Sequence, residues 1–461
     1  MMLLYVVFLV VPDLARVPIL LIAGLMVVVI AFTSIELTLY LLIFATLLSP
    51  ELNVGGGGTV ADITTGRITT TQSRGITLRL DDVLLLLVCL TWLFRMAIYK
   101  ELGSVRPTPI NQPIVWYWLV AFFSTLIGFY FGNVGVYGFF FVLKYLEYFL
   151  LFYMIINHLH DHATIKRYLV VLLVTCLLVS LVGMSQIPSG ARVSAPFEGA
   201  EGEPNTFGGY LMMMFSLVLG IFLYTPKGKR RLMLMMMMGI ILIPFAFTES
   251  RSSYLSFVVA MGLFLFYSEK KRFLIGAALV SIVILPVMLP QNVIDRVMFT
   301  FNQADEAGQL KVGGIKIDTS TTERFKSWER VLTEKFPANP MLGVGVTGGG
   351  FLDAQYPRIL LESGLIGLIL FIWFLRRIWI LLKQCYAEIE DETFKGAALG
   401  TICGFGGLVV HAIGANTFII VRIMEPFMII IALLFAALIV QQDKSRVEEP
   451  TDEGLQSESL G

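Results

Sequence analysis

The sequence is poor in charged residues for its length. Only 15% of its 461 residues are Asp, Glu, Lys or Arg, whereas 56% are hydrophobic. A soluble chain of this size carries about 25% charged residues to cover its surface. The formal net charge is zero, so nothing points to nucleic acid as a partner. The shortage of charge therefore excludes an ordinary soluble domain and indicates a membrane protein.

The sequence also has few cysteines. No pair has the spacing of a metal site, and none lies in the largest hydrophilic loop, so we expect no disulfide framework. Three lie in apolar segments and Cys385 lies in a short charged loop; the four are Cys89, Cys176, Cys385 and Cys403. The first residues lack a charged segment and a small-residue cleavage site, which favours a short membrane segment over a removed signal peptide.

Long apolar runs recur along the whole sequence, each close to the roughly 20 residues that cross a hydrocarbon core of about 30 Å. Asp13, Arg16 and Glu36 interrupt the first three runs. We therefore expect an all-α polytopic membrane protein with about 12 to 14 transmembrane helices. The expected spans are residues 1–12, 17–33, 35–50, 82–98, 114–131, 134–156, 167–187, 205–224, 231–248, 252–268, 272–290, 358–381, 396–414 and 423–440.

Basic residues in the short loops orient the chain. One alternate set of loops, with the C-terminal tail, holds 18 Lys and Arg, whereas the opposite short loops hold 6. Because Lys and Arg resist translocation, the basic set is expected in the cytoplasm. The expected parts are an N-terminal bundle of about 11 helices at 1–290, a large extracytoplasmic loop at 291–357, a three-helix segment at 358–440 and a disordered cytoplasmic tail at 441–461.

The large loop contains one predicted amphipathic helix, at residues 321–336. Ser320 and Glu323 have the spacing of a capping box, and Pro337 stops the helix. Its apolar side chains share one face: Phe325, Trp328, Leu332 and Phe336. Such a helix lies either on the membrane–water boundary or against other residues of the loop.

Ionisable residues at membrane depth are costly, so each needs a partner or a function. Lys144 and Glu147 are three residues apart on one helix and form an internal ion pair or part of a proton or ion relay. His411 is near the outer end of its helix. It is either a hydrogen-bonded core histidine or a site residue.

Arg251 lies in a polar turn between two apolar spans. Its guanidinium suits a phosphate or pyrophosphate, or else reaches the interface as a snorkelling or salt-bridged side chain. A glycine-dense run at residues 339–350 follows in the large loop. Glycine-rich turns can cradle phosphate, but this run lacks the Lys-Ser/Thr ending of a P-loop, so the pattern alone is weak evidence.

Three ionisable residues surround the start of the next span. Asp353 and Arg358 lie just outside it, and Glu362 lies about one turn inside. A carboxyl group buried in a membrane is neutral or paired. Arg358, four residues earlier on the helix, is the expected partner of Glu362.

Four short motifs over residues 196–372 resemble, in this order, those of the O-antigen ligase and polysaccharide polymerase superfamily. They are Pro204-Asn205, Ser250-Arg251-Ser252, Arg324…Trp328 with Asn339–Gly345, and Tyr356…Glu362-x-Gly364-x-x-Gly367. The resemblance implies a GT-C-like glycosyltransferase architecture in the bacterial inner membrane, with an active site that faces the periplasm.

The resemblance also implies a mechanism: an inverting transfer of a glycan from undecaprenyl pyrophosphate to a sugar hydroxyl, with no metal, nucleotide or other cofactor. Arg251 and Arg324 would hold the pyrophosphate and stabilise its growing charge. Asp353, or as second choice Glu362, would act as general base. The remaining residues implied in substrate binding are Arg358, Tyr356, Asn205 and His411.

One position departs from the family pattern. Family ligases usually carry histidine three residues before the tyrosine, where this sequence has Asp353. We therefore expect a polymerase of an exported polysaccharide, either an exopolysaccharide or an O-antigen. The alternatives are a ligase that moves glycan to lipid A core or protein, and a transporter or flippase of lipid-linked sugar, although the paired inverted halves of transporters are not seen. The expected partners are the lipid-linked oligosaccharide, membrane lipid, a chain-length regulator and other polysaccharide-assembly proteins.

Overall fold

The computed structural model describes residues 29–30, 33–49, 51–54, 76–98, 106–196, 202–288, 311–312, 315–316, 319–350 and 352–448. The predicted span at 1–12 and nearly all of that at 17–33 lie outside these residues. The other predicted spans each correspond to a helix of the structure. These helices are α3 (Ile35–Leu48), α4 (Leu80–Ile98), α5 (Asn111–Tyr130), α6 (Tyr137–His158), α7 (His162–Gln186), α8 (Pro204–Tyr224), α9 (Lys229–Phe247), α10 (Arg251–Tyr267), α11 (Lys271–Met288), α14 (Gln355–Glu388), α15 (Glu392–Gly414) and α16 (Val421–Glu448).

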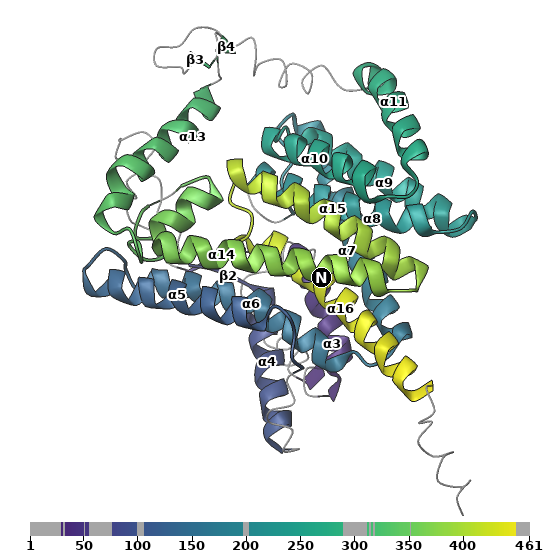
Figure 1. Ribbon diagram of the computed structural model, residues 1–461, viewed down its shortest axis with the longest axis horizontal. Coiled ribbons are helices and arrows are strands. Elements are labelled where there is room, and N and C mark those ends of the chain that lie inside the picture. Colours follow the sequence, from purple (N-terminus) through teal and green to yellow (C-terminus); the bar gives the residue numbers. More distant parts are fainter. Residues whose placement is uncertain are drawn as a thin grey trace, which may run out of the picture.

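Short elements connect these helices. A helix of the large loop, α13 (Thr319–Arg330), rises at one end of the bundle (Figure 1). Two small antiparallel hairpins are the β-structure of the described residues: β1 (Glu51–Val54) with β2 (Ile76–Arg79), and β3 (Lys311–Val312) with β4 (Ile315–Lys316). The hairpins lie in connections and leave the architecture helical.

Eight helices among the described residues are long and apolar enough to cross a membrane. They are α5, α6, α7, α8, α9, α14, α15 and α16. In Figure 1, α5, α14 and α15 lie side by side along the bundle. The protein is therefore an all-α multi-pass membrane protein, as predicted.

Helix α8 forms the centre of the bundle, since every residue from Thr206 to Leu223 is buried. Helix α15 packs along it at very short range. Gly396 and Gly400 of α15 face Gly220 of α8, and a Cβ atom at any of the three would overlap backbone atoms of the other helix. Small residues spaced four apart allow such packing in membranes, where association relies on close contact between backbones.

Helix α14 is broken at Gly364, which has φ 64° and ψ −165°. The glycine-dense segment 339–350 inserts at this break. The amides of Val344 and Gly345 donate to the carbonyl oxygens of Leu361 and Glu362, each at 2.9 Å. The break thus supplies backbone partners for the segment, and the prediction of one continuous helix over 358–381 is wrong at this point.

Replacing Gly364 with alanine is expected to destabilise the folded protein by at least about 3 kcal/mol. Its backbone conformation is accessible essentially to glycine alone, and a Cβ atom there would overlap the carbonyl oxygen of Met341. Thermal unfolding in nanodiscs would measure the loss. Gly262→Ala is the matched control, because a Cβ at this α10 position meets no described atom within 4 Å. Equal unfolding temperatures for the two variants would contradict the prediction.

The internal ion pair predicted at Lys144 exists, but with a different partner. Lys144 Nζ lies 3.2 Å from Asp82 Oδ2 of α4, and the two side chains are 18% and 9% exposed. The predicted pairing with Glu147 is therefore wrong. Spacing along one helix could not reveal this partner, because it lies on another helix.

Three other local predictions need correction. Helix α13 begins at Thr319, one residue before the expected cap Ser320. Cys385 lies inside α14 and is fully buried, not in a charged loop. Helix α16 continues to Glu448, so the first part of the predicted disordered tail is helical, whereas residues 449–461 lie outside the described chain.

The predicted amphipathic helix of the large loop has two environments. After Arg330 the chain continues as a π-helical turn, Val331–Lys335, and a short 3-10 turn, Phe336–Ala338. Val331 is fully buried and packs with Leu352, just before α14, and with Leu361 of α14. Phe325, in contrast, is 53% exposed. The burial of Val331 agrees with packing against other residues of the protein, and contact of the exposed Phe325 with the membrane–water boundary stays a prediction.

Candidate active site

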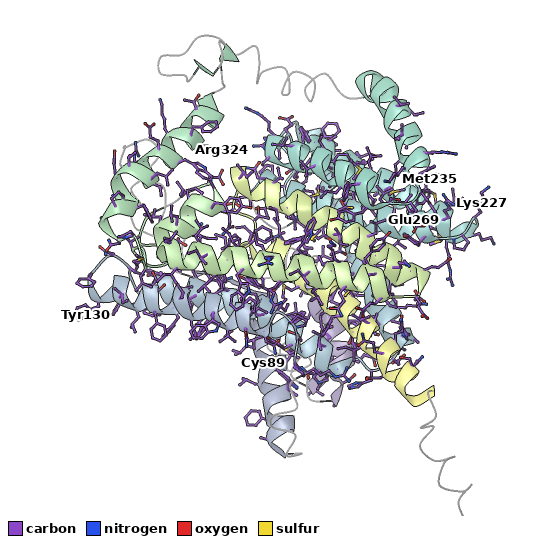
Figure 2. All side chains as sticks on the ribbon, in the orientation of Figure 1. Cys89, Tyr130, Lys227, Met235, Glu269 and Arg324 are labelled. Carbon is purple, nitrogen blue, oxygen red and sulfur yellow. The ribbon has the colours of Figure 1, made fainter. Side chains whose placement is uncertain are left out.

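Helices α6, α8, α10, α14 and α16 begin at one end of the bundle, which we call the site end, and α5 and α15 end there. Figure 2 shows Arg324 and Tyr130 toward this end, and Lys227 and Glu269 at the opposite end. The first turn of a helix has free backbone N–H groups and a partial positive charge. The individual helix N-termini at the site end therefore offer donors to an anionic ligand, although the C-terminus of α15 contributes partial negative charge at the same end.

Arg324 and Asp353 form an ion pair at the site end. Arg324 Nη2 lies 3.5 Å from Asp353 Oδ2, and the side chains are 26% and 39% exposed. Arg324 extends from α13, whereas Asp353 lies in the irregular residues just before α14. The sequence marked both as site residues, and the structure brings them into contact at a place that solvent reaches.

The surroundings of Asp353 shift its acidity. Burial by protein atoms and, to a smaller extent, the negative charge of Glu203 raise the pKa of its carboxyl group, Arg324 and Arg358 act in the opposite direction, and the net result is a pKa of about 6. A carboxylate with a pKa near 6 is ionised at neutral pH and accepts a proton more readily than an ordinary aspartate. Asp353 therefore has the protonation behaviour that a general base needs.

Arg251 is the first residue of α10, directly after the N-cap Ser250. The adjacent Ser252 lies against the C-terminal end of α15. A Cβ atom on Gly414 would lie 3.5 Å from Ser252 Cβ and 3.8 Å from Arg324 Nη1. The Arg324 side chain thus reaches from the large loop to the start of α10, and the two predicted arginines come from adjoining elements.

Asn205 lies in the first turn of α8 and contacts the same helix start. Its Oδ1 accepts a hydrogen bond of 2.7 Å from Ser250 Oγ. Ser253 Oγ in turn donates to Ser250 Oγ at 2.8 Å. Two of the predicted motifs, the Pro-Asn and the Ser-Arg-Ser, are therefore held together by a cluster of hydroxyl groups.

His411 is fully buried next to this cluster. Its Nε2 lies 3.2 Å from Ser253 Oγ, and its Nδ1 lies 2.8 Å from Thr417 Oγ1. The histidine is thus hydrogen-bonded inside the bundle, as one of its two expected roles requires. It does not reach a ligand at the surface directly, so any influence on substrate passes through Ser253.

Arg358 and Glu362 form the ion pair that their spacing predicted. Arg358 Nε lies 3.0 Å from Glu362 Oε1, and the side chains are only 12% and 5% exposed. The amide of Thr347 also donates to Glu362 Oε1 at 3.0 Å. Glu362 is therefore occupied in holding the loop to α14, which makes it a poorer candidate for general base than Asp353.

Tyr356 points into the bundle. Its hydroxyl donates to the carbonyl oxygen of Val409 at 2.7 Å, and its ring packs edge-on against Phe371. These contacts join α14 to α15. They give Tyr356 a packing role behind the site, whereas the sequence alone suggested contact with substrate.

The glycine-dense run does not have the free amides of a phosphate cradle. The backbone N–H groups from Val344 through Gly348 all donate to protein oxygen atoms, among them Thr125 Oγ1 and Glu362 Oε1. The run serves instead to join α5, α14 and the large loop.

Two charged residues near the site were missed as candidates. Arg422 is 4% exposed at the start of α16, and its Nη1 donates to the carbonyl oxygen of Pro196 at 2.9 Å. Glu203 is the N-cap of α8 and acts on the pKa of Asp353. From the sequence, Arg422 entered only the count of basic residues in the loops. A cation at the start of a long apolar helix also predicts a buried partner for that cation.

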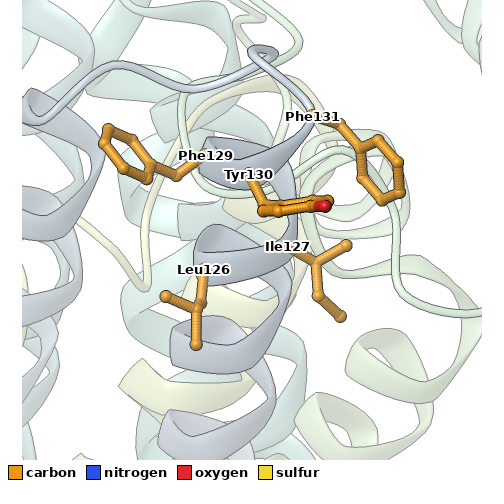
Figure 3. A pocket seen from close by; sticks show the side chains of 5 residues that line it. All are labelled: Leu126, Ile127, Phe129, Tyr130 and Phe131. Atoms are coloured by element: carbon orange, nitrogen blue, oxygen red, sulfur yellow. The ribbon is translucent and has the colours of Figure 1, made fainter.

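The described residues offer no metal site, since no three His, Cys, Asp or Glu side chains among them gather closely enough to bind an ion. An open apolar depression of about 540 Å³ lies at the end of α5 (Figure 3). Its lining is Leu126, Ile127, Phe129, Tyr130 and Phe131. Exposed aromatic rings of this kind are typical of the membrane–water boundary, and none of these residues provides the charges of the Arg324–Asp353 site.

Comparison with known families matches the central part of the chain. The family model described as O-antigen ligase matches residues 240–372. No curated protein matches the chain. The matched segment contains Arg251, Arg324, Asp353 and Glu362, whereas Asn205 and His411 lie outside it. This match supports the resemblance of the chain to the O-antigen ligase and polysaccharide polymerase superfamily.

Proposed function

We propose that this protein is a polymerase of an exported bacterial polysaccharide. It would transfer a growing glycan from undecaprenyl pyrophosphate to a sugar hydroxyl on another lipid-linked glycan, at the outer face of the inner membrane. The observation that carries this proposal is the Arg324–Asp353 pair, in which a cation and a carboxylate of raised pKa lie together at the site end.

In this reaction the bond between the anomeric carbon and the pyrophosphate oxygen breaks, and the acceptor oxygen bonds to the same carbon. Negative charge grows on the pyrophosphate as it leaves. Arg324 and Arg251, supported by the N-terminus of α10, are suited to stabilise that charge. Asp353 would remove the proton of the acceptor hydroxyl. Attack from the side opposite to the leaving group would invert the anomeric configuration.

The identity of the acceptor separates the two activities of the superfamily. Purified protein in vesicles would be supplied with radiolabelled undecaprenyl-pyrophosphate repeat units and analysed for product length. A ladder of longer lipid-linked glycans supports the polymerase. Transfer of label only to an added lipid A core or protein acceptor would replace the proposal by the ligase. Movement of label across the vesicle without extension would replace it by the flippase.

The pH dependence of transfer is expected to follow Asp353. Because its pKa is raised to about 6, protonation removes the base as the pH falls through that value. The rate at subsaturating acceptor is expected to be level above pH 7 and to fall about tenfold per unit below pH 6. A rate profile that stays flat down to pH 5 would count against Asp353.

A second variant tests the cause of this shift. Glu203→Gln removes a negative charge that raises the pKa of Asp353. The fall in rate on the acidic side of the pH profile is therefore expected to move to lower pH. Asp391→Asn alters an ion pair with Lys166 elsewhere in the protein. This control variant is expected to leave the pH at which the rate falls unchanged.

A further inference from the structure

His411 and Asn205 are joined by an unbroken chain of hydrogen bonds. The chain runs from Thr417 Oγ1 to His411 Nδ1, from His411 Nε2 to Ser253 Oγ, then to Ser250 Oγ and Asn205 Oδ1, with lengths of 2.8, 3.2, 2.8 and 2.7 Å. It connects the start of α16 through α15 and α10 to α8. Neither the matched family segment nor the proposed mechanism uses the histidine.

The hydroxyl protons fix the direction of this chain. Ser250 has one proton, which goes to Asn205 Oδ1. Ser253 also has one, and its shortest bond takes it to Ser250. Ser253 Oγ must therefore accept from His411 Nε2, because a hydroxyl whose proton is already used can only accept.

His411 is consequently protonated on Nε2 and accepts on Nδ1 from Thr417, whose other acceptor, the carbonyl oxygen of Ala415, is farther away at 3.3 Å than Nδ1 at 2.8 Å. This is the neutral imidazole. The alternative, an imidazolium ion, would place a charge at a position with no solvent exposure, and its two hydrogen-bond partners are neutral hydroxyl groups. Burial of a charge without an ionic partner is strongly unfavourable.

The helices are shaped to admit this chain. A Cβ atom on Gly208 of α8 would overlap Ser253 Oγ, and one on Gly209 would lie 3.1 Å from His411 Cε1. Two adjacent glycines thus let Ser253 and the imidazole approach α8. The close fit holds the ring in one place, which a chain with a fixed direction requires.

The far end of the chain is the Asn205 side-chain amide. Since Oδ1 faces Ser250, the NH₂ group faces away from the cluster. Among the described residues no acceptor takes its hydrogens, and Asn205 is partly exposed at the site end. The amide therefore presents two donors beside the first turn of α10, where Arg251 lies.

We propose that His411 is a positioning residue: as neutral imidazole it orders the hydroxyl chain and so turns the Asn205 amide to donate to pyrophosphate oxygens of the substrate. The proposal rests on the proposed function for the identity of the anion. Rotation of the amide would place its carbonyl oxygen against the same anion, so both the presence and the orientation of Asn205 matter. His411 itself touches no substrate.

The test measures binding of undecaprenyl pyrophosphate to the protein in nanodiscs. His411→Phe and Asn205→Ala are each expected to raise the Kd about tenfold, the effect of losing a charge-assisted hydrogen bond. The double variant is expected to bind no worse than Asn205→Ala, because the histidine acts through that amide. Asn205→Asp, which keeps the oxygen toward Ser250 and removes the donors, is expected to bind at least as poorly as Asn205→Ala.

His411→Gln is the conservative variant, because its amide both donates and accepts; it is expected to stay within about threefold of wild type. Thr417→Val is used if His411→Phe fails to fold. This variant removes the hydroxyl that donates to His411 Nδ1, so that either ring nitrogen can carry the proton. It is expected to weaken binding. Additive losses in the double variant, or wild-type binding in both His411→Phe and Thr417→Val, would overturn the proposal.

Failure of the proposed function would look different. A wild-type protein that binds undecaprenyl pyrophosphate but extends no lipid-linked glycan would refute the polymerase and leave the coupling between His411 and Asn205 measurable. A wild-type protein that extends glycan but shows no such coupling would refute only the positioning role. A wild-type protein that does not bind the probe would overturn the positioning role.

Discussion

Replacing Arg324 with alanine is expected to abolish detectable glycan extension, with turnover lower by about a hundredfold or more. The guanidinium is the cation that reaches from the large loop to the start of α10. Its loss removes charge stabilisation where the pyrophosphate departs. Because the same group also binds the anion before reaction, the KM for the lipid-linked donor is expected to rise as well. Initial rates over a range of donor concentrations would measure both effects.

Lys326 offers a matched control on the same helix. Its side chain is exposed, and Lys326→Ala removes one positive charge from α13 without touching Asp353. Near-normal rates are expected for this variant. If Arg324→Ala and Lys326→Ala reduce the rate equally, the effect of Arg324 reflects only the general charge of the loop, and its specific role is wrong.

The second large effect is expected at Asp353. Asp353→Asn keeps the size of the side chain but cannot accept a proton, so turnover is expected to fall by about a hundredfold to ten-thousandfold. Donor binding is expected to be retained or slightly tighter, since Arg324 loses its carboxylate partner and keeps its full charge for the pyrophosphate. A fall in turnover without a rise in the donor KM is therefore the expected signature.

Asp353→His provides the positive comparison for this position. An imidazole can also accept a proton, so this variant is expected to recover part of the activity that Asp353→Asn loses. Wild-type turnover in Asp353→Asn would remove Asp353 as the base. Equal inactivity in both variants would assign the residue to structure through its ion pair with Arg324.

The helices and the positions of most candidate site residues could be predicted because they leave marks in the sequence. Apolar length predicts a membrane span, and the spans from 35–50 onward each match a helix. Arg251 and Asp353 stood out because charged residues are rare beside apolar runs, whereas Arg324 was singled out only by the family motif that it resembles. The Arg358–Glu362 pair was accessible for a simpler reason, since both members lie four residues apart on one helix.

Contacts between helices could not be predicted in the same way. Lys144 has a plausible partner three residues away, yet it pairs with Asp82 on a distant part of the chain. The glycine-dense run suggested a phosphate cradle, but its amides are taken by the break in α14. A sequence pattern fixes which groups need partners. It does not fix which partners the packed bundle supplies.

The break at Gly364 also determines which part of this protein could be exchanged with a relative. Hydropathy would divide the chain between the large loop and the helix that follows, near residue 357. The structure joins these two parts through backbone hydrogen bonds from Val344 and Gly345 to Leu361 and Glu362. A chimera joined near residue 357 would combine the glycine-dense segment of one parent with the broken helix α14 of the other. Residues 339–367 therefore form one exchangeable module, and substrate preference is best transplanted with that module intact.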